Sequence, residues 1–448
     1  MSGENMNREI RLPEYAKTAM KVLNDNGFEA FVVGGCVRDS IMGKKADDWD
    51  MTTSATPEET LEAFKNFRTI PTGIKHGTIT VLIDKQPLEI TTFRIDGEYT
   101  DNRRPDSVNF TRNIENDLSR RDFTVNAMAY NERSGIVDLF GGMEDIKNKI
   151  IRCVGDPDKR FNEDALRIMR AIRFSATLGF EIEEKTAESI KRNKHLLKNI
   201  AAERIRIELE KLLLGKDAER ILHEFSDVIF EIIPELEKTS GVKQNCPYHI
   251  YDVWGHIVKS VAVSEKNKYV RLCMLLHDIG KPQMKTTDEK GQDHFKGHAK
   301  VSADMAFEIL KRLRYDNKTI SVVTKLIFHH DDRMYNAPQN VKKHAAKYGF
   351  PFLYLLDKVS RADILAQTPE MSDRISDCDS YIEKLRELED ENPCLEISDL
   401  KVNGNDLIPL GFRGKEIGKT LEKLLDKVIK NEIKNSKEDL LKFLNKGD

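Results

Sequence analysis

The sequence predicts an α+β protein, in which a small α/β head reaches to about residue 150 and the remainder is helical. Three runs in the first third, AFVVGG, GTITVLI and LEITTF, are rich in β-branched and aromatic residues and bounded by glycine, proline or polar residues, as strands are. After IIRCVGDP these runs stop, and apolar residues recur at intervals of three and four, as in EDALRIMRAIRF and ERIRIELEKLLL. We therefore expect an all-helical body behind the head.

Length and composition indicate several soluble domains. A chain of 448 residues, 39% of them hydrophobic, can bury more than one core. No run approaches the roughly 20 apolar residues of a membrane helix, and the first residues lack an apolar signal region. The six cysteines form no CxxC pair, which argues against a zinc knuckle and a disulfide framework. We expect a cytoplasmic protein with reduced thiols and no membrane partner.

Breaks in the pattern divide the chain into four expected domains. Pro234 and the run TSGVKQNCP end the first helical region, and LEDENPCLEISD precedes a last helical segment. We place the domains at 1–150, 151–235, 236–370 and 371–448. The net charge of −3 hides arginine clusters at 103–121 and 160–173, so it does not exclude a nucleic-acid partner.

The junction FVVGGCVRD could hold a phosphate. A strand that runs into Gly34 and Gly35 and then into a helix lets backbone N–H groups approach phosphate oxygens, and Arg38 adds positive charge. A tight turn with surface charges produces the same pattern, so these residues alone do not decide.

Asp48 and Asp50 follow on an extended segment, where a separation of two residues places both carboxylates on one face. Such a pair suits Mg²⁺, and in nucleotidyl transfer two metals about 3.5–4 Å apart activate the attacking oxygen and stabilise the leaving one. The alternative is a solvated acidic turn ahead of the cap-like run TPEE.

Five segments together resemble one family. GGCVRD, DDWD, RRDFTVNAMAY, RFNEDALRIMRAIRF and ERIRIELEKLL occur in the order and spacing of class II tRNA nucleotidyltransferases, the bacterial CCA-adding enzymes, whose core is shared with bacterial poly(A) polymerases. The resemblance covers residues 10 to 215 approximately. It implies a head like that of DNA polymerase β, with Asp48 and Asp50 as catalytic Mg²⁺ ligands, and the substrates tRNA, CTP and ATP.

The run EDALRIMRAIR is interpreted as one helix that carries Asp164, Arg167 and Arg170 on one side. Cytosine and adenine each present an exocyclic amine beside a bare ring nitrogen, so Asp164 could accept from the amine and Arg167 donate to the nitrogen. Guanine and uracil reverse this order, which leaves polar groups unpaired at about 1–3 kcal/mol each. The resemblance implies the same use of the motif, whereas a salt bridge within the helix is the alternative.

The resemblance also implies further nucleotide contacts. It places Arg121 at the nucleotide and assigns Asp122 and Asn126 to ribose recognition. Arg170 and Arg173 suit triphosphate, because guanidinium forks match phosphate oxygens. A helix capped by Asp122 and a structural ion pair at Arg173 are the alternatives.

The segment FRIDGEYTDNRRPDSVNF resembles the flexible loop, with its D-x-R-R-P core at Asp101–Pro105, that CC-adding enzymes lack. We therefore expect addition through the terminal A. An A-adding enzyme or a poly(A) polymerase keeps the same chemistry and is the first alternative.

Histidine and aspartate are concentrated in the helical half, in YHIYDVWGHIVKS, LLHDIGKP, GHAKVSADMA, FHHDDR and SRADIL. Such residues suit a divalent-metal phosphohydrolase. The segments resemble the HD superfamily, which implies a metal site of His256, His277, Asp278 and Asp363, with hydrolysis of phosphoesters at RNA ends as its activity. A phosphohydrolase whose head only binds nucleotide is a further alternative.

The last segment, GFRGKEIGKTLEKLL, resembles the helical tail of the family, where RNA contacts are expected. Its helix would start at a glycine-rich turn with cations nearby, which suits a phosphate backbone. An amphipathic helix with a solvated Lys/Glu face is equally consistent.

Overall fold

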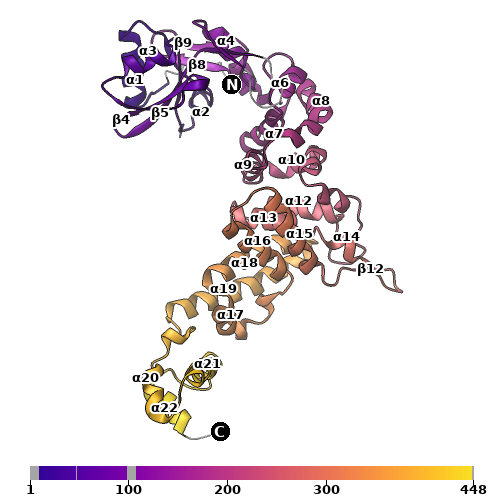
Figure 1. Cartoon of the computed structure of the whole chain (residues 1–448). Helices are drawn as coiled ribbons and strands as arrows, with labels where there is room; N and C mark the ends of the chain where they lie inside the picture. Colours follow the sequence, from indigo (N-terminus) through magenta and orange to yellow (C-terminus); the bar gives the residue numbers. More distant parts are fainter. Residues whose placement is uncertain (1–9, 47, 98–106, 446–448) are drawn as a thin grey trace. The chain divides into compact units, whose positions relative to one another are not determined.

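The computed structural model describes residues 10–46, 48–97 and 107–445 and divides into two compact units (Figure 1). The first unit ends at Pro234 and the second begins at Glu235. Among the described residues, no helix is both long enough and apolar enough to cross a membrane.

A seven-stranded mixed sheet lies at the centre of the head. Its order is β3-β4-β5-β2-β1-β8-β9, and its one parallel ladder among the described residues joins β2 to β5. Every residue of β1 is buried, which explains its continuous apolar run. The sheet strands are β1 (Ala30–Val33), β2 (Asp50–Thr53), β3 (Arg68–Gly73), β4 (Thr78–Ile83), β5 (Gln86–Thr92), β8 (Met128–Asn131) and β9 (Gly135–Asp138), and a separate ribbon pairs β6 (Arg94–Asp96) with β7 (Val108–Phe110).

Short helices accompany these strands, and longer ones follow them. Those of the head are α1 (Glu14–Asp25), α2 (Gly35–Ile41), α3 (Pro57–Ala63), α4 (Ile114–Ser119) and α5 (Gly142–Asn148). The helical part of the first unit comprises α6 (Pro157–Glu163), α7 (Leu166–Leu178), α8 (Glu184–Asn193), α9 (Ala202–Leu213), α10 (Ala218–Glu224) and α11 (Ser226–Ile232). Thr56 and Glu59 close a capping box on α3, so the TPEE run does cap a helix, but without Asp48 or Asp50.

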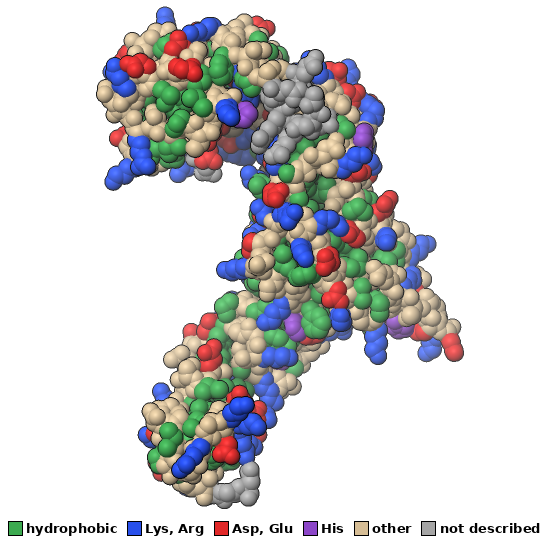
Figure 2. Space-filling view, in the orientation of Figure 1, with side chains coloured by type: hydrophobic (Ala, Val, Ile, Leu, Met, Phe, Trp, Pro, Cys, Tyr) green, Lys and Arg blue, Asp and Glu red, His purple; other side chains and the backbone are tan. Residues whose placement is uncertain are grey.

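The second unit is built from packed helices and a smaller terminal group. It comprises α12 (Val253–Val263), α13 (Lys268–Leu276), α14 (Lys281–Met284), α15 (His298–Arg312), α16 (Asn317–His329), α17 (Val341–Tyr348), α18 (Phe350–Leu365) and α19 (Ile375–Asp390), then α20 (Gly404–Leu407), α21 (Lys415–Ile429) and α22 (Lys437–Asn445). In α21 the apolar stripe of Leu421, Leu424 and Val428 is buried in a small core. On the face drawn in Figure 2, basic and acidic side chains are interspersed over these terminal helices.

The structure confirms the expected α+β class with one small correction. Beyond residue 150 the chain is not entirely helical, because two-residue strands pair as β10 (Ile150–Ile151) with β11 (Glu181–Ile182) and β12 (Thr286–Thr287) with β13 (Asp293–His294). Strands this short carry no period that a sequence pattern could reveal.

Candidate nucleotidyl-transfer site and histidine cluster

The glycine pair forms a sharp turn between β1 and α2. Gly34 has φ 83° and ψ −129°, a conformation that residues with side chains rarely adopt. A Cβ atom at Gly34 would lie 3.3 Å from Nη1 of Arg121, so that guanidinium approaches the turn closely. Arg38 of α2 is buried; it donates to Asn126 Oδ1 at 2.6 Å and forms an ion pair with Asp39. The expected residues Gly34, Arg38, Arg121 and Asn126 are therefore brought together, and Gly35 begins α2.

Asp50 is the first residue of β2 and lies in register with Val33 of β1 and Glu89 of β5. Asp48 and Asp50 line a cavity of about 450 Å³ together with Tyr15 and Glu89. Both aspartates are exposed to this cavity, yet the surrounding protein excludes part of the water around Asp50. That desolvation, reinforced by Glu89 and Asp48, raises the pKa of Asp50. An acidic pocket of this kind favours a cation.

Glu89 was not anticipated. Its only signal in the sequence is a carboxylate inside the strand-like run LEITTF. The parallel ladder between β2 and β5 brings it beside Asp50, and no local pattern predicts that pairing.

Asp122 links the glycine turn to α7. Its carboxylate accepts from Asn126 Nδ2 at 3.2 Å and pairs with Arg170 Nη2 at 2.7 Å. Burial alone would raise the pKa of Asp122, but Arg170 and Arg167 lower it to about 2. Arg121 is anchored separately, on the buried carboxylate of Asp117 at 3.2 Å. These carboxylates hold the arginines in fixed positions.

Arg173 and Arg170 share a second carboxylate, Glu208 of α9. Arg173 Nε lies 2.8 Å from Glu208 Oε2, and Arg170 Nη1 lies 4.0 Å from Oε1. The Arg173 guanidinium also stacks on Phe174, with its carbon 3.5 Å from the ring centre. Arg173 thus sits in the structural ion pair that we gave as its alternative. The sequence pattern ERIRIELEKLL contains Glu208, but only the packing of α9 against α7 reveals the contact.

Asp164 corrects the predicted single helix. α6 ends at Glu163 and α7 begins at Leu166, while Asp164 has the extended values φ −138° and ψ 101°. Its Oδ1 accepts from the Leu166 N–H at 3.1 Å, a local bond by which aspartate competes with helix continuation. Asp164 and Arg167 are therefore neighbours across a helix break. The expected loop core Asp101–Pro105 lies outside the described residues, between the paired strands β6 and β7.

A second cluster lies in the second unit, where His256, His277, Asp278 and Asp363 are brought together from α12, the end of α13 and α18. His256 Nε2 lies 2.9 Å from Asp363 Oδ1 and 3.2 Å from His277 Nε2, and His277 Nε2 lies 3.2 Å from Asp278 Oδ2. All are buried except Asp363, which is partly exposed. Burial lowers the pKa of His277, but Asp278 and Asp363 outweigh it and raise that pKa to about 10. The cluster therefore attracts positive charge.

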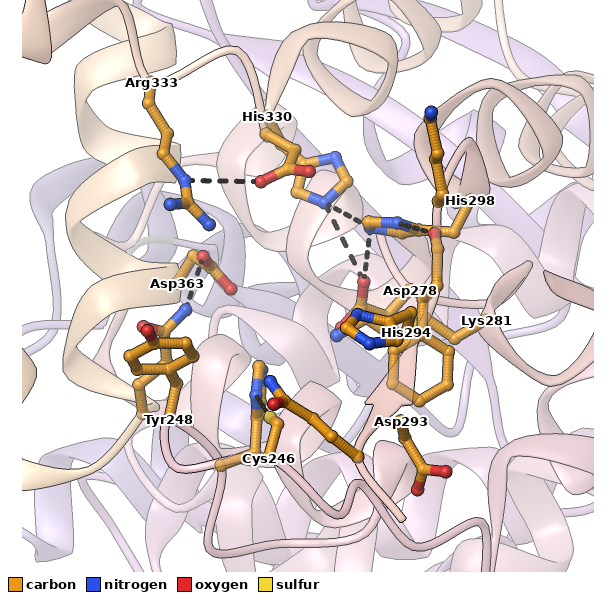
Figure 3. Close-up of a pocket in the computed structure, with 16 residues that line it drawn as sticks. Cys246, Tyr248, Asp278, Lys281, Asp293, His294, His298, His330, Arg333 and Asp363 are labelled. Carbon is orange, nitrogen blue, oxygen red and sulfur yellow. Dashed lines mark hydrogen bonds and ion pairs between the residues drawn. The ribbon is translucent and has the colours of Figure 1, made fainter. Parts of the chain in front are cut away.

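Two further histidines complete a second ligand group on the other oxygen of Asp278. His298 Nε2 lies 3.2 Å and His330 Nε2 lies 3.8 Å from Asp278 Oδ1, and the three side chains point toward one another (Figure 3). The resemblance did not assign these histidines to the metal site, and their convergence depends on the packing of α15 against α16. The neighbouring His329 instead pairs with Asp332 at 2.6 Å.

The donor chemistry of this cluster fits a metal. The Nδ1 atoms of the four histidines face the backbone carbonyls of Ala366, Met274, Phe295 and Ile327. A carbonyl only accepts, so each Nδ1 carries a proton and each Nε2 faces the centre, where a metal would replace any proton on that nitrogen. Asp278 Oδ2 pairs with the Lys281 ammonium at 2.6 Å, and neither buried oxygen of Asp278 has a well-aligned hydrogen bond from the described residues. Imidazole nitrogens that converge on a carboxylate in this way suit a first-row transition metal.

Three family models match the chain. They are the "Poly A polymerase head domain" over residues 30–152, the "Probable RNA and SrmB- binding site of polymerase A" over 179–238, and a tRNA nucleotidyltransferase domain 2 over 295–444. The first match includes the glycine turn and the carboxylate pair, so the head of this protein resembles a nucleotidyltransferase domain. Nucleotidyltransferases of this type generally use a divalent metal.

Proteins with similar sequences include CCA-adding enzymes of two bacteria. A CCA-adding enzyme of Lactobacillus helveticus is 49% identical over 241 residues, which are 53% of this chain and 60% of that protein. A CCA-adding enzyme of Bacillus pumilus is 43% identical over 259 residues, 56% of this chain and 64% of that protein. The matches thus span less than two thirds of these relatives.

Solved structures match over nearly the whole chain. The Bacillus stearothermophilus CCA-adding enzyme in complex with CTP is 29% identical, covers 97% of this chain and 96% of its own, and gives a TM-score of 0.73. The Thermotoga maritima CCA-adding enzyme complexed with tRNA, at 23% identity and a TM-score of 0.59, supports the fold alone. Over most of its length the chain is thus similar to class II CCA-adding enzymes.

Proposed function

We propose that this protein adds or repairs the 3′-terminal CCA of tRNA, using CTP and ATP without a nucleic-acid template. The observation that carries the proposal is the position of Asp50, in register with Glu89 and beside the glycine turn that Arg121 approaches. This arrangement combines a metal platform with a triphosphate cradle in one unit. A cytoplasmic location belongs to the same proposal.

The reaction would transfer a nucleotidyl group. The tRNA 3′ oxygen bonds to the α-phosphorus of CTP or ATP, the bond from that phosphorus to the bridging oxygen breaks, and pyrophosphate leaves while the hydroxyl proton passes to solvent. Asp48 and Asp50 would hold Mg²⁺, which lowers the barrier by activating the attacking oxygen and stabilising the leaving one. Glu89 adds a third carboxylate to this platform.

The arginine network would bind the nucleotide. Gly34, Gly35 and Arg38 form the proposed triphosphate cradle, with Arg121 at the nucleotide. Asp122 and Asn126 would face the ribose, Arg170 and Arg173 would support the phosphates, and Asp164 and Arg167 would select cytosine and adenine by their paired acceptor and donor. The domain assignments 1–150 for the head, 151–235 for the neck and body, 236–370 for the HD domain and 371–448 for an RNA-binding tail remain part of this proposal.

Incorporation assays test the proposal. Purified protein is incubated with tRNA lacking CCA and with each labelled nucleoside triphosphate in turn. Addition of C, then one A and a stop, is the expected result. Addition of A alone, or of a long A tract, would instead assign an A-adding enzyme or a poly(A) polymerase.

We further propose metal-dependent hydrolysis of phosphoesters at RNA ends by the histidine cluster. A divalent metal would be held by His256, His277, Asp278 and Asp363, and the second group, Asp278 with His298 and His330, offers room for another. A cavity of about 310 Å³ opens onto Asp278 and Asp363 and is also lined by Lys296 and Arg333, cations that suit a phosphate group. Two reactions test this second activity: release of phosphate from a 3′-phosphorylated RNA end, and opening of a 2′,3′-cyclic phosphate by water to a terminal monophosphate. Both should be lost in His277→Ala.

A further inference from the structure

We infer that Tyr248 and Gln367 form a nucleoside subsite beside the histidine cluster. Tyr248 would stack on the base of a terminal RNA nucleotide, and Gln367 would accept a hydrogen bond from its ribose. The inference rests on the hydrolysis proposed for the cluster, and it names the residues that would select the substrate of that reaction.

The cavity beside the cluster offers more than a phosphate group needs. Lys296 and Arg333 suit the phosphate, but the same cavity is also lined by the aromatic ring of Tyr248 and the amide of Gln367. Its volume of about 310 Å³ lies at the lower end of the range for small-molecule sites, roughly 300–1,000 Å³. The space therefore suits one terminal nucleotide rather than a longer stretch of RNA.

Tyr248 is held in place and yet open to a ligand. The residue is 41% exposed, and the guanidinium carbon of Arg374 lies 5.6 Å from the centre of its ring, a cation–π distance. Its carbonyl accepts from the Thr368 N–H at 3.1 Å, which ties it to the residue directly after Gln367. Figure 3 draws Tyr248 and Asp363 in the same part of the pocket. Such a ring can stack on a base, because every base has a π-face.

Gln367 presents a hydrogen-bond acceptor. Its Nε2 donates to Asp363 Oδ2 at 3.0 Å. Because a carboxylate only accepts, this bond fixes the amide so that Oε1 faces away from Asp363. That Oε1 atom is buried and has no hydrogen-bond donor among the described residues. A buried acceptor without a donor is costly, and the 2′-hydroxyl of a ribose would supply the donor.

Asp363 connects the two groups to the proposed metal site. It is one of the proposed ligands, it holds Gln367, and Gln367 adjoins the residue that holds Tyr248. A phosphate bound at the cluster would therefore have the ribose and the base of the same nucleotide within this subsite. The subsite predicts a preference for nucleotides over other phosphoesters, and for ribose over deoxyribose.

The first test compares Tyr248→Ala with Tyr251→Ala in the full-length chain. Tyr251 is a matched control, because it is 38% exposed on the same segment but is not among the described residues that line the cavity. Phosphate release is measured from guanosine 3′-monophosphate and from glycerol 2-phosphate, which has no nucleoside. We expect Tyr248→Ala to lower the preference for the nucleotide about tenfold, through KM, while Tyr248→Phe and Tyr251→Ala keep it.

The second test addresses Gln367 through the 2′-hydroxyl. Gln367→Leu removes the acceptor, but it also removes the donor to Asp363. The readout is therefore the preference for guanosine 3′-monophosphate over its 2′-deoxy form, because a change at the metal site affects both substrates equally. We expect this preference to fall about fivefold to tenfold.

Binding without reaction gives an independent readout. Equilibrium dialysis measures the Kd of labelled guanosine, which carries no phosphate to release and whose base the selection proposed for the head rejects. We expect Tyr248→Ala to raise this Kd about tenfold, while the metal content, measured by mass spectrometry, stays unchanged.

Two results would overturn the inference. One is a nucleotide preference and a Kd for guanosine in Tyr248→Ala equal to those of Tyr251→Ala. The other is an equal fall for all substrates together with a loss of metal, which would indicate a structural role alone. If the parent protein releases phosphate from none of the substrates, the proposed hydrolysis fails. The dialysis of guanosine against the parent and Tyr248→Ala then decides on the subsite separately.

Discussion

The two acidic centres of this protein are built on different principles. The acidic side chains of the head, Asp48, Asp50 and Glu89, offer only carboxylate oxygens to the cavity that they line. The histidine cluster mixes imidazole nitrogens with two carboxylates, and most of its members are fully buried. Backbone carbonyls also fix its histidines through their Nδ1 atoms, whereas no described residue hydrogen-bonds the exposed carboxylates of the head in this way.

Because of this difference, we expect the two centres to prefer different metals and to release them at different rates. Carboxylates on an open surface suit Mg²⁺, which keeps several waters and is commonly held by one or two carboxylates together with substrate phosphates. Imidazoles that are already oriented suit a first-row transition metal and lose little freedom when they bind one. We therefore expect the head to exchange its metal with each substrate and the cluster to retain its own.

The largest effect should come from removing one centre at a time. Replacing both Asp48 and Asp50 with alanine should reduce CTP and ATP incorporation by about a thousandfold or more, because the metal platform is lost. The metal content of the histidine cluster, measured by mass spectrometry, should stay unchanged, and tRNA binding should survive. Glu58→Ala, an exposed acid on α3, is the matched control.

The reciprocal variant sharpens the comparison. His277→Ala should lose the cluster metal while incorporation by the head changes less than about twofold, since the substitution leaves every head ligand in place. Incorporation that falls in parallel with the metal content would contradict the separation of the two centres.

A chelator should distinguish the centres next. Brief dialysis against EDTA, followed by gel filtration, should abolish incorporation until Mg²⁺ is returned, because the exposed oxygen ligands release their ion readily. The cluster should keep most of its metal over the same period. Equal loss from both centres would show that burial of the histidines gives no retention.

Glu89 should contribute less than the aspartate pair. Glu89→Gln keeps the shape of the side chain but removes one charge from the cavity, so we expect incorporation to fall about tenfold to a hundredfold and the Mg²⁺ requirement to rise. A variant with unchanged Mg²⁺ dependence would remove Glu89 from the platform. Initial rates over a magnesium titration provide the measurement.

The smallest effect concerns stability within the head. The pKa of Asp122 is about 2 in the folded protein, below the ordinary value of about 3.9. Because the pKa of Asp122 is lower in the folded protein, its ionised carboxylate stabilises the fold at pH values above the unfolded pKa. This contribution to the free energy of unfolding is about 2 kcal/mol at neutral pH and disappears as the pH falls from about 4 to 2. Asp122→Asn should lack this loss. Urea unfolding of both proteins at pH 7, 4 and 3 measures this difference. If the free energies of unfolding of the two proteins fall equally with pH, the stabilising role of the Asp122 carboxylate is contradicted.

The sequence predicted those parts of the head that depend on local spacing. The glycine turn, the aspartates two residues apart and the arginines of α7 follow from short runs of neighbouring residues. Glu89 and Glu208 could not be predicted, because each reaches its partner through strand pairing or helix packing between distant segments. The break at Asp164 was missed because the apolar period of three and four continues across it.

The histidine cluster, too, could be predicted only in part. Its four expected ligands were found from the resemblance of short motifs, and the structure brings them together. His298 and His330 were visible in the sequence, but His329 adjoins one of them and points elsewhere. Only the way in which α15, α16 and α13 pack decides which histidine faces Asp278.

The parallel pairing of β2 with β5 has a consequence for how the protein acquires activity. Asp50 and Glu89 are separated by two intervening strands of the chain, β3 and β4, which must fold back before the two carboxylates meet. Contacts of this kind carry a large loop-closure cost and form late relative to neighbouring hairpins. A newly synthesised head would thus bring these two carboxylates together only when its least local strand pairing is complete.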